Sequence, residues 1–176
     1  MDFKYKLANL SDITAIKELM YYSTSELLGQ YFGTDQLEAS FESMGLDDQL
    51  IKDKTYFLVI SGKNLVGCGG WSYRRTLYGG NHTPNRSNNT LNPSIDPARI
   101  RAMYTHPEFT RKGIGSLILD LSESAAKKEG FSAIELMATL SGLPLYHARG
   151  YKEYSRENFV SSKGIEVPLF KMAKKL

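Results

Sequence analysis

The sequence predicts a mixed α/β protein built in layers. Segments that alternate apolar and polar residues are interleaved with segments whose apolar residues recur every three or four positions. Clusters of Gly, Asn, Pro and Ser separate these segments. Their order along the chain is β-α-α-β-β-β-α-β-α-β-β. A chain of 176 residues fits one domain, residues 1–176, in which residues 79–97 form a long loop insertion.

Composition and charge narrow the class of protein. With 41% hydrophobic residues the chain can bury a core, and its net charge of +3 is too small to indicate nucleic-acid binding. The single cysteine, Cys68, excludes an internal disulfide and a thiolate metal cluster, and it fits a reducing compartment. The start of the chain lacks a signal-peptide pattern, and no stretch approaches the roughly 20 apolar residues of a membrane span. We therefore expect a cytoplasmic protein without a membrane partner.

The N-terminal part of the chain begins with a strand and two helices. Residues 3–8 alternate apolar and polar side chains, as a half-buried strand does. Asn9 is a good N-cap for the helical repeat that follows, and this helix is predicted to run to about Leu28. An apolar stripe within residues 34–50 predicts the second helix.

A hairpin follows the two helices. Residues 56–60 and 65–73 read as strands, and "SGKN" supplies the turn between them. Glycines at positions 67, 69 and 70 leave one strand with bare backbone. Such a strand is typical of a bulge, or of an element that packs very close to the main chain.

The C-terminal half supplies the remaining elements. Residues 98–105 read as a strand that Pro107 ends, and a helix is predicted from Gly113 to about Glu129. Further elements are predicted as a strand at 131–138, a short helix at 143–150, and strands at 151–156 and 165–176.

The loop "TRKGIGS" (110–116), between the strand and the long helix, is the clearest candidate for a binding site. Glycines 113 and 115 let a ligand approach the main chain, and the first turn of a helix leaves N–H groups without internal partners. Together with the helix dipole these groups form an anion site, to which Arg111 and Lys112 add charge. The combination suits a diphosphate, although a solvated loop with a helix start has the same spacing.

Two better-known phosphate-binding patterns do not fit this loop. A Walker loop requires Lys-Ser or Lys-Thr after its last glycine, whereas Gly115 is followed by Ser116 and Leu117. The dinucleotide fingerprint requires glycine or alanine at position 118, which is Ile.

Four segments in order resemble the GCN5-related N-acetyltransferase (GNAT) family. "KYKLANLSDITAIKELM" resembles the family's opening strand and helix, and "LVGCGGWSYR" its central strand. "MYTHPEFTRKGIGSLIL" is similar to its acetyl-CoA loop, and "LPLYHARGYKEY" to its C-terminal segment. The resemblance implies the GNAT-like acyl-CoA N-acyltransferase fold, a central twisted mixed sheet flanked by helices. In that fold the fourth and fifth strands, here 98–105 and 131–138, splay apart around the cofactor.

The same resemblance implies acetyl-CoA as cosubstrate and assigns residues to it. The family's Gln/Arg position falls on Thr110, and the basic residue stands instead at Arg111, where glycine is common. Ser141 replaces an asparagine that is frequent in the family, and its hydroxyl can still bond the pantetheine arm. Main-chain groups of Met103, Tyr104 and Thr105 are expected beside the pantetheine, and Arg111, Lys112, Gly113, Ile114, Gly115 and Ser116 around the diphosphate.

A tyrosine is the expected catalytic residue. In the family, a tyrosine four residues before the glycine of the C-terminal turn points at the cofactor sulfur, and Tyr146 stands in that position before Gly150. A phenol with a pKa of about 10 can protonate a departing thiolate, so Tyr146 is predicted to be the general acid. Core packing of an aromatic side chain is the alternative interpretation.

The sequence identifies no proton acceptor for the amine and no metal site. Glu135, His82 and Asp96 are alternatives for a base, and each is equally well explained as a structural or solvated residue. His106 and His147 are too isolated to indicate a metal.

The predicted function is transfer of an acetyl group from acetyl-CoA to a primary amine by direct attack. Main-chain N–H groups are expected to stabilise the oxyanion, and the acceptor, a small molecule or a peptide, to enter over the first helices and the 79–97 loop. A non-catalytic acyl-CoA-binding sensor or interaction module of the same fold is the alternative. The acceptor is not specified, and a homodimer stays open because exposed sheet edges in such folds often pair.

Overall fold

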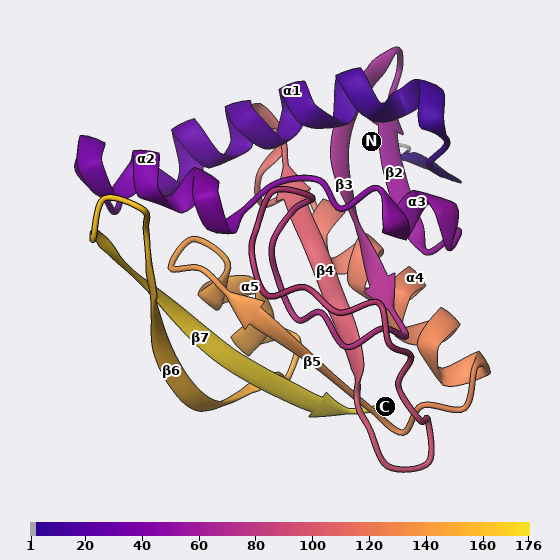
Figure 1. The fold of residues 1–176 in the computed structure, drawn as a ribbon. Helices are drawn as coiled ribbons and strands as arrows, with labels where there is room; N and C mark the ends of the chain where they lie inside the picture. The colour runs from indigo at the N-terminus through magenta and orange to yellow at the C-terminus, as the bar shows by residue number, and fades with distance from the viewer. Residues whose placement is uncertain (1–2) are drawn as a thin grey trace.

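The computed structural model describes residues 3–176, and its seven strands form one sheet in the order β1-β2-β3-β4-β5-β7-β6 (Figure 1). Neighbouring strands are antiparallel, except that β4 and β5 run parallel. The mixed sheet predicted from the sequence is therefore confirmed. The strands are β1 (Lys4–Leu7), β2 (Tyr56–Ser61), β3 (Asn64–Ser72), β4 (Ala98–Thr105), β5 (Ala133–Ala138), β6 (Lys152–Val160) and β7 (Glu166–Lys175).

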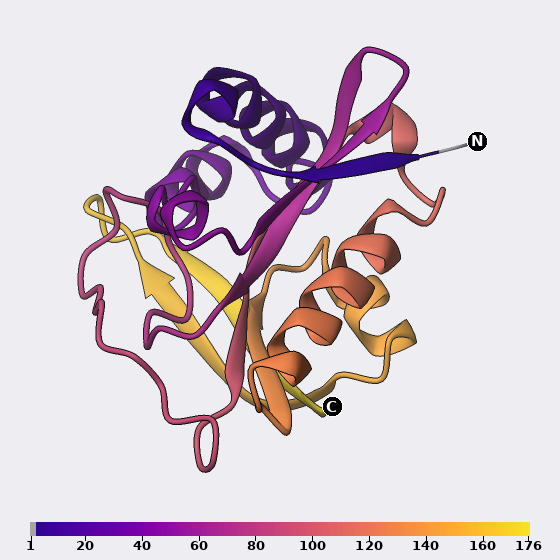
Figure 2. The same ribbon diagram turned by 90° about the vertical axis from the view of Figure 1, so that its right-hand side faces the viewer.

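Helices cover both faces of the sheet (Figure 2). The first two pack on one face, and α4 and α5 pack on the other. Between residues 3 and 176, every helix is too short or too polar to cross a membrane. The helices are α1 (Ile13–Ser23), which continues into the π-helical turn η2 (Thr24–Leu28), α2 (Thr34–Ser43), α3 (Gln49–Lys52), α4 (Ile114–Lys128) and α5 (Leu143–Ala148).

The second helix, predicted within 34–50, is α2, and it occupies the first part of that range. The α2 helix ends at Ser43, and Met44 is extended with φ −120° and ψ 166°. Gly45 follows with φ +129°, a backbone conformation that is incompatible with an α-helix and that favours glycine. The chain therefore breaks between α2 and α3, and this break lies near the end of β4.

The glycine-rich strand β3 packs closely against a helix, and a bulge interrupts its pairing with β4. A Cβ atom on Gly67 would lie 2.3 Å from Cγ2 of Ile114, so α4 packs directly against bare backbone. The register between β3 and β4 shifts between Cys68 and Gly70, opposite Ala102, whose φ is +50°. The bulge is thus carried by β4, and the glycines of β3 accommodate it.

The two parallel strands at the centre of the sheet separate soon after they meet. Pairing between β4 and β5 is limited to Ala98 with Ile134 and Arg99 with Glu135. An ion pair between the side chains of Arg99 and Glu135 reinforces this closed end. Beyond it, β5 continues along β7 as far as Ala138 while β4 follows β3. The splay implied by the family resemblance is therefore present.

The long connection between β3 and β4 lies across the sheet near β4 and is fixed there by a buried arginine (Figure 1). Arg101, only 2% exposed, donates from Nη1 to the carbonyl of Thr76 at 3.0 Å and from Nη2 to that of Gly79 at 2.8 Å. Its Nη2 also lies 3.0 Å from Oδ2 of the buried Asp47. The loop is thereby held beside the gap between β4 and β5.

Candidate active site

The main cavity, of about 520 Å³, opens where β4 and β5 separate. Its wall combines the end of β4, the loop before α4, the segment from Thr139 to Ala148, and the η2 turn. Most of the residues that the sequence assigns to acetyl-CoA or to catalysis therefore meet in one place. Those in the wall are Met103, Tyr104, Thr105, Arg111, Gly113, Ile114, Gly115, Ser116, Ser141 and Tyr146.

The start of α4 gives the main cavity a set of main-chain donors. Gly113 is the N-cap, with φ +87° and no side-chain cap, and a Cβ atom built on it would meet nothing within 4 Å. The first helical hydrogen bond runs from the N–H of Leu117 to the carbonyl of Gly113 at 2.9 Å. The N–H groups that precede it lack partners within the helix and lie at the positive end of its dipole.

The two cations of this loop are placed differently. Arg111 lies in the cavity wall, with a left-handed φ of +60° that favours glycine. Lys112 lies outside the wall, because its Nζ donates to the carbonyl of Glu108 at 2.8 Å and sits 4.6 Å from the centre of the Phe109 ring. Thr110 turns its hydroxyl to the carbonyl of Pro107 at 3.1 Å. The geometry thus brings Arg111, and not Lys112, to the main cavity.

Gly115 has a packing role that the sequence did not reveal. A Cβ atom at this position would lie 2.6 Å from Cδ2 of Leu145. The absence of a side chain at Gly115 therefore lets α5 sit close against the first turn of α4. This contact places the start of α4 next to the helix that carries Tyr146.

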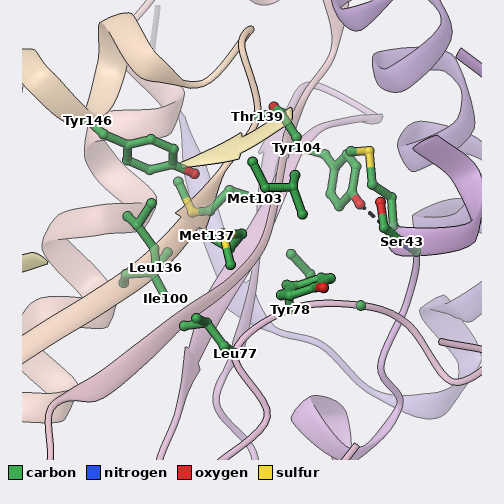
Figure 3. A pocket seen from close by; sticks show the side chains of 15 residues that line it. Ser43, Leu77, Tyr78, Ile100, Met103, Tyr104, Leu136, Met137, Thr139 and Tyr146 are labelled. Atoms are coloured by element: carbon green, nitrogen blue, oxygen red, sulfur yellow. Dashed lines mark hydrogen bonds between the residues drawn. The ribbon is translucent and has the colours of Figure 1, made fainter. Parts of the chain in front are cut away.

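A smaller inner cavity of about 80 Å³ adjoins the main one between β4 and β5 (Figure 3). Tyr146 lines both cavities, and Figure 3 shows its hydroxyl pointing toward Met103. The side chain is 7% exposed and packs edge-on against Tyr151, with 5.8 Å between ring centres. Burial raises the pKa of Tyr146 above its usual value, so the phenol keeps its proton at neutral pH.

The bulge of β4 lies beside the two cavities. Ala102 lines the inner cavity with φ +50°, and its carbonyl accepts a hydrogen bond of 2.7 Å from the hydroxyl of Tyr56. Because a bulge interrupts the ladder, main-chain groups near Met103 are freed from strand pairing. The sequence predicted a bulge from the β3 glycines, but not that it would fall on β4 at the site.

An outer cleft of about 470 Å³ lies next to the same strand, on the side of α1. It shares Thr24, Met44 and Tyr104 with the main cavity. The hydroxyl of Tyr104 accepts a hydrogen bond of 3.2 Å from the N–H of Gly45. Sequence reasoning assigned only the main chain of Tyr104, whereas its side chain borders all three spaces. The outer cleft is lined by Lys17, Met20, Tyr21, Thr24, Phe41, Met44, Gly45, Leu46, Asn81, His82 and Tyr104.

The three alternatives for a base are separated by the fold. His82 lines the outer cleft, and its Nε2 lies 2.8 Å from the carbonyl of Phe41. Glu135 is engaged by Arg99 and accepts a hydrogen bond of 2.6 Å from Tyr154. Asp96 accepts from the N–H of Asn92 at 2.8 Å, within the long loop. Of the three, His82 is the one in the wall of a cavity described above.

Two further chemistries receive no support from the described residues. Cys68 is fully buried, and burial raises the pKa of its thiol to about 12, which disfavours the nucleophilic thiolate. Within residues 3–176, no three His, Cys, Asp or Glu side chains are grouped so that they would hold a metal ion.

A mixed sheet that splays beside a glycine-capped helix defines an acyl-CoA N-acyltransferase type of fold. The model of the Acetyltransferase (GNAT) family matches residues 21–151, and the chain belongs to that family. An uncharacterised N-acetyltransferase of Chlorobaculum tepidum is 32% identical over 66 residues, which make up 38% of this chain and 41% of that protein. That match spans less than half of the relative's length.

Solved structures share the fold over the whole chain. A GCN5-related N-acetyltransferase from Rhodopseudomonas palustris gives a TM-score of 0.73 at 16% identity, covering 100% of this chain and 97% of that one. PaiA N-acetyltransferase from Thermoplasma acidophilum, in complex with coenzyme A, gives 0.64 at 16% identity, with 100% of both chains covered. YncA from Salmonella typhimurium, a putative acetyltransferase with its cofactor acetyl-CoA, gives 0.64 at 16%, covering 100% and 95%. At these identities the likeness establishes the fold.

Proposed function

We propose that this protein transfers an acetyl group from acetyl-CoA to a primary amine by direct attack. The observation that carries the proposal is the main cavity, which joins the N-terminus of α4 and Arg111 at one side to Tyr146 at the other. The main cavity and the outer cleft are neighbours, because Tyr104 lines both of them. The main cavity thus combines an anion-binding site at the start of α4 with the phenol of Tyr146, and the outer cleft beside it offers a route for a second substrate.

The seat fits the diphosphate of coenzyme A. The open left-handed position of Gly113 leaves room for phosphate oxygens near the first N–H groups of α4. Arg111 adds a formal positive charge beside them. Met103, Tyr104 and Thr105 would flank the pantetheine arm, and Ser141 would reach it from the opposite wall. When bound, acetyl-CoA supplies an acetyl group activated as a thioester.

The residues of this chain supply the remaining chemistry. Main-chain N–H groups freed by the β4 bulge near Met103 would stabilise the charge that develops on the carbonyl oxygen as the amine attacks. Tyr146 is protonated at neutral pH, as an ordinary phenol is and as its raised pKa also requires, and it would deliver that proton to the departing sulfur. The result is a secondary amide and a free thiol.

His82 is the proposed acceptor of the proton that the amine loses. Its Nε2 is within hydrogen-bonding distance of the Phe41 carbonyl, which cannot donate, so a neutral ring would carry its proton on Nε2. The lone pair is then on Nδ1, which lies toward Gly45 in the wall of the outer cleft. An amine passing through the cleft would lose its proton to this atom, directly or through water.

A panel of primary amines assayed with acetyl-CoA and a thiol-detecting reagent tests the proposal. The expected result is thiol release that depends on the amine, with the acetylated product identified by mass spectrometry. Protein stabilised by coenzyme A that releases no thiol with any amine would instead be the non-catalytic acyl-CoA sensor. Absence of coenzyme A binding would contradict both functions.

A further inference from the structure

We infer that the acceptor is a monoamine on an aromatic or other apolar body whose far end is anionic or neutral, and that polyamines are excluded. This inference rests on the proposed function, since it names the class of amine that the outer cleft selects. Three features of the wall of that cleft determine this selection: its length, its aromatic rings and its charge.

One face of α1 forms a wall of the outer cleft. Lys17, Met20, Tyr21 and Thr24 stand at positions i, i+3, i+4 and i+7, which lie on one side of a helix. Thr24 also lines the main cavity, so this end of the stripe is next to the proposed reaction site. Lys17 lies seven residues away, about 10 Å along a helix axis. An acceptor whose amine reaches the main cavity therefore extends toward Lys17.

The middle of the outer cleft is aromatic and apolar. Tyr21 and Phe41 stack with 5.3 Å between ring centres and 20° between ring planes. Tyr21 is 66% exposed, so much of its ring is available to a ligand. Met44, which is half-buried, adds a flexible apolar side chain to the same wall, and the buried Met20 lies behind it as core. An aromatic or branched body bound here buries apolar surface, which favours its binding.

The charge of the cleft is positive. Across the part of the chain that the structure describes, no lining residue of either the outer cleft or the inner cavity is acidic. Lys17 has no ion-pair partner among residues 3–176. The second ammonium of a diamine would face Lys17, and the lining of the cleft offers it no acidic side chain as a counter-charge. A carboxylate at the same end would instead pair with it.

Three matched acceptors test the inference: para-(aminoethyl)benzoate, its benzamide and its benzylamine. They share the aminoethyl group and the ring and differ at the far end, which is anionic in the first, neutral in the second and a cationic second amine in the third. We expect kcat/KM and the affinity for the coenzyme A-saturated protein to fall from the carboxylate to the amide to the second amine. The carboxylate and the diamine are expected to differ by at least about tenfold, a difference of about 1.4 kcal/mol. Putrescine and spermidine are expected to be poorer still.

Charge reversal at Lys17 is the decisive variant. Lys17→Glu should invert the order of the three acceptors in affinity and in kcat/KM. Lys63→Glu, in the exposed turn between β2 and β3, changes the net charge by the same amount and should leave that order unchanged. Affinities are measured by ligand-observed NMR, and kcat/KM is measured separately in the turnover assay. Lack of turnover with preserved binding order would overturn the proposed function and support the inference about the cleft. Equal affinity for the three compounds, or preference for the diamine, would overturn the inference.

Discussion

The N–H of Gly45 donates a hydrogen bond of 3.2 Å to the hydroxyl of Tyr104. This bond joins the break between α2 and α3 to the strand that borders the main cavity, the inner cavity and the outer cleft. Gly45 has φ +129°, so the break depends on a residue that tolerates this conformation. The walls proposed for the acceptor and for the cofactor are therefore tied together by one phenol.

Tyr104→Phe removes the hydroxyl and leaves the ring. We expect the free energy of unfolding to fall by about 1 kcal/mol, the usual contribution of one such hydrogen bond. The turnover number should fall because the wall near Met44 loses its anchor, while affinity for coenzyme A changes little. Urea unfolding, calorimetry and steady-state kinetics measure the three quantities.

Tyr154→Phe is the matched control for this change. Its hydroxyl bonds Glu135 at 2.6 Å, at the closed end of the splayed strands. Turnover should stay at the parent level in this variant. A loss of turnover equal to that of Tyr104→Phe would show that the effect of the Tyr104 variant is not local to the cleft.

Arg111 and Lys112 should contribute unequally to cofactor binding. Arg111→Ala removes the cation from the cavity wall, and we expect the Kd for coenzyme A to rise by about tenfold or more, as for a charge-assisted contact of 1.5–3 kcal/mol. Lys112→Ala should raise it much less, because that ammonium is bound to the carbonyl of Glu108. Titration calorimetry in low and high salt checks both.

Arg111→Gly separates the charge of this residue from its backbone strain. Glycine tolerates φ +60° at no steric cost, so the free energy of unfolding should rise by about 1 kcal/mol relative to Arg111→Ala, with the same loss of coenzyme A affinity. Equal stability of the two variants would mean that the left-handed position costs the parent protein nothing.

Tyr146→Phe should lower turnover by about a hundredfold, the low end for loss of a general acid, with nearly unchanged affinity for coenzyme A. Parent-level turnover in this variant would remove the proposed role of the phenol.

The raised pKa of Tyr146 also predicts a pH dependence of stability. Above pH 10 the unfolded chain loses this proton while the buried phenol retains it. The free energy of unfolding therefore falls as the pH rises past 10, by up to about 1.4 kcal/mol per pH unit for one group. Because Tyr146→Phe lacks this group, its stability should decline less steeply between about pH 10 and pH 11. Chemical unfolding at both pH values measures the slope, and equal slopes would contradict the burial effect.

The buried pair of Asp47 and Arg101 should hold the long loop in place. Arg101→Met removes one of the two cations paired with the buried Asp47 carboxylate and leaves its ion pair with Arg86, and we expect a loss of about 3 kcal/mol or more in stability. Because Arg101 also donates to the carbonyls of Thr76 and Gly79, hydrogen exchange should accelerate within residues 76–86 of the loop before it does in the strands of the sheet. Uniform acceleration across the sheet would show that the pair does not act on the loop.

Most of the fold was predictable because local patterns determine it. Alternation predicted strands, Pro107 ended one of them, and helical spacing predicted α4 close to its observed bounds. The end of the second helix was not located within 34–50, because the apolar stripe of Leu37, Phe41 and Met44 stops just before Gly45 without marking the break. A single glycine in the sequence does not by itself predict φ +129°.

The parts of the site that consist of main chain were predictable from the sequence. The parts that depend on where side chains point and pack were less so. The glycine loop predicted the start of α4, yet spacing alone could not show that Lys112 turns away or that Gly115 serves packing against Leu145. The outer cleft joins α1, the α2–α3 break and the 79–97 loop, which lie far apart in sequence. No local sequence pattern predicts that these three segments lie side by side. The positions of His82 and Tyr104 in the wall of the cleft follow from the tertiary fold.

A crystal structure with bound coenzyme A tests the central claim most directly. We expect the diphosphate at the N–H groups that open α4, within reach of Arg111, and the pantetheine between β4 and β5 with its sulfur near Tyr146. Coenzyme A seated outside the gap between these strands, or a protein that does not bind it at millimolar concentration, would contradict the account.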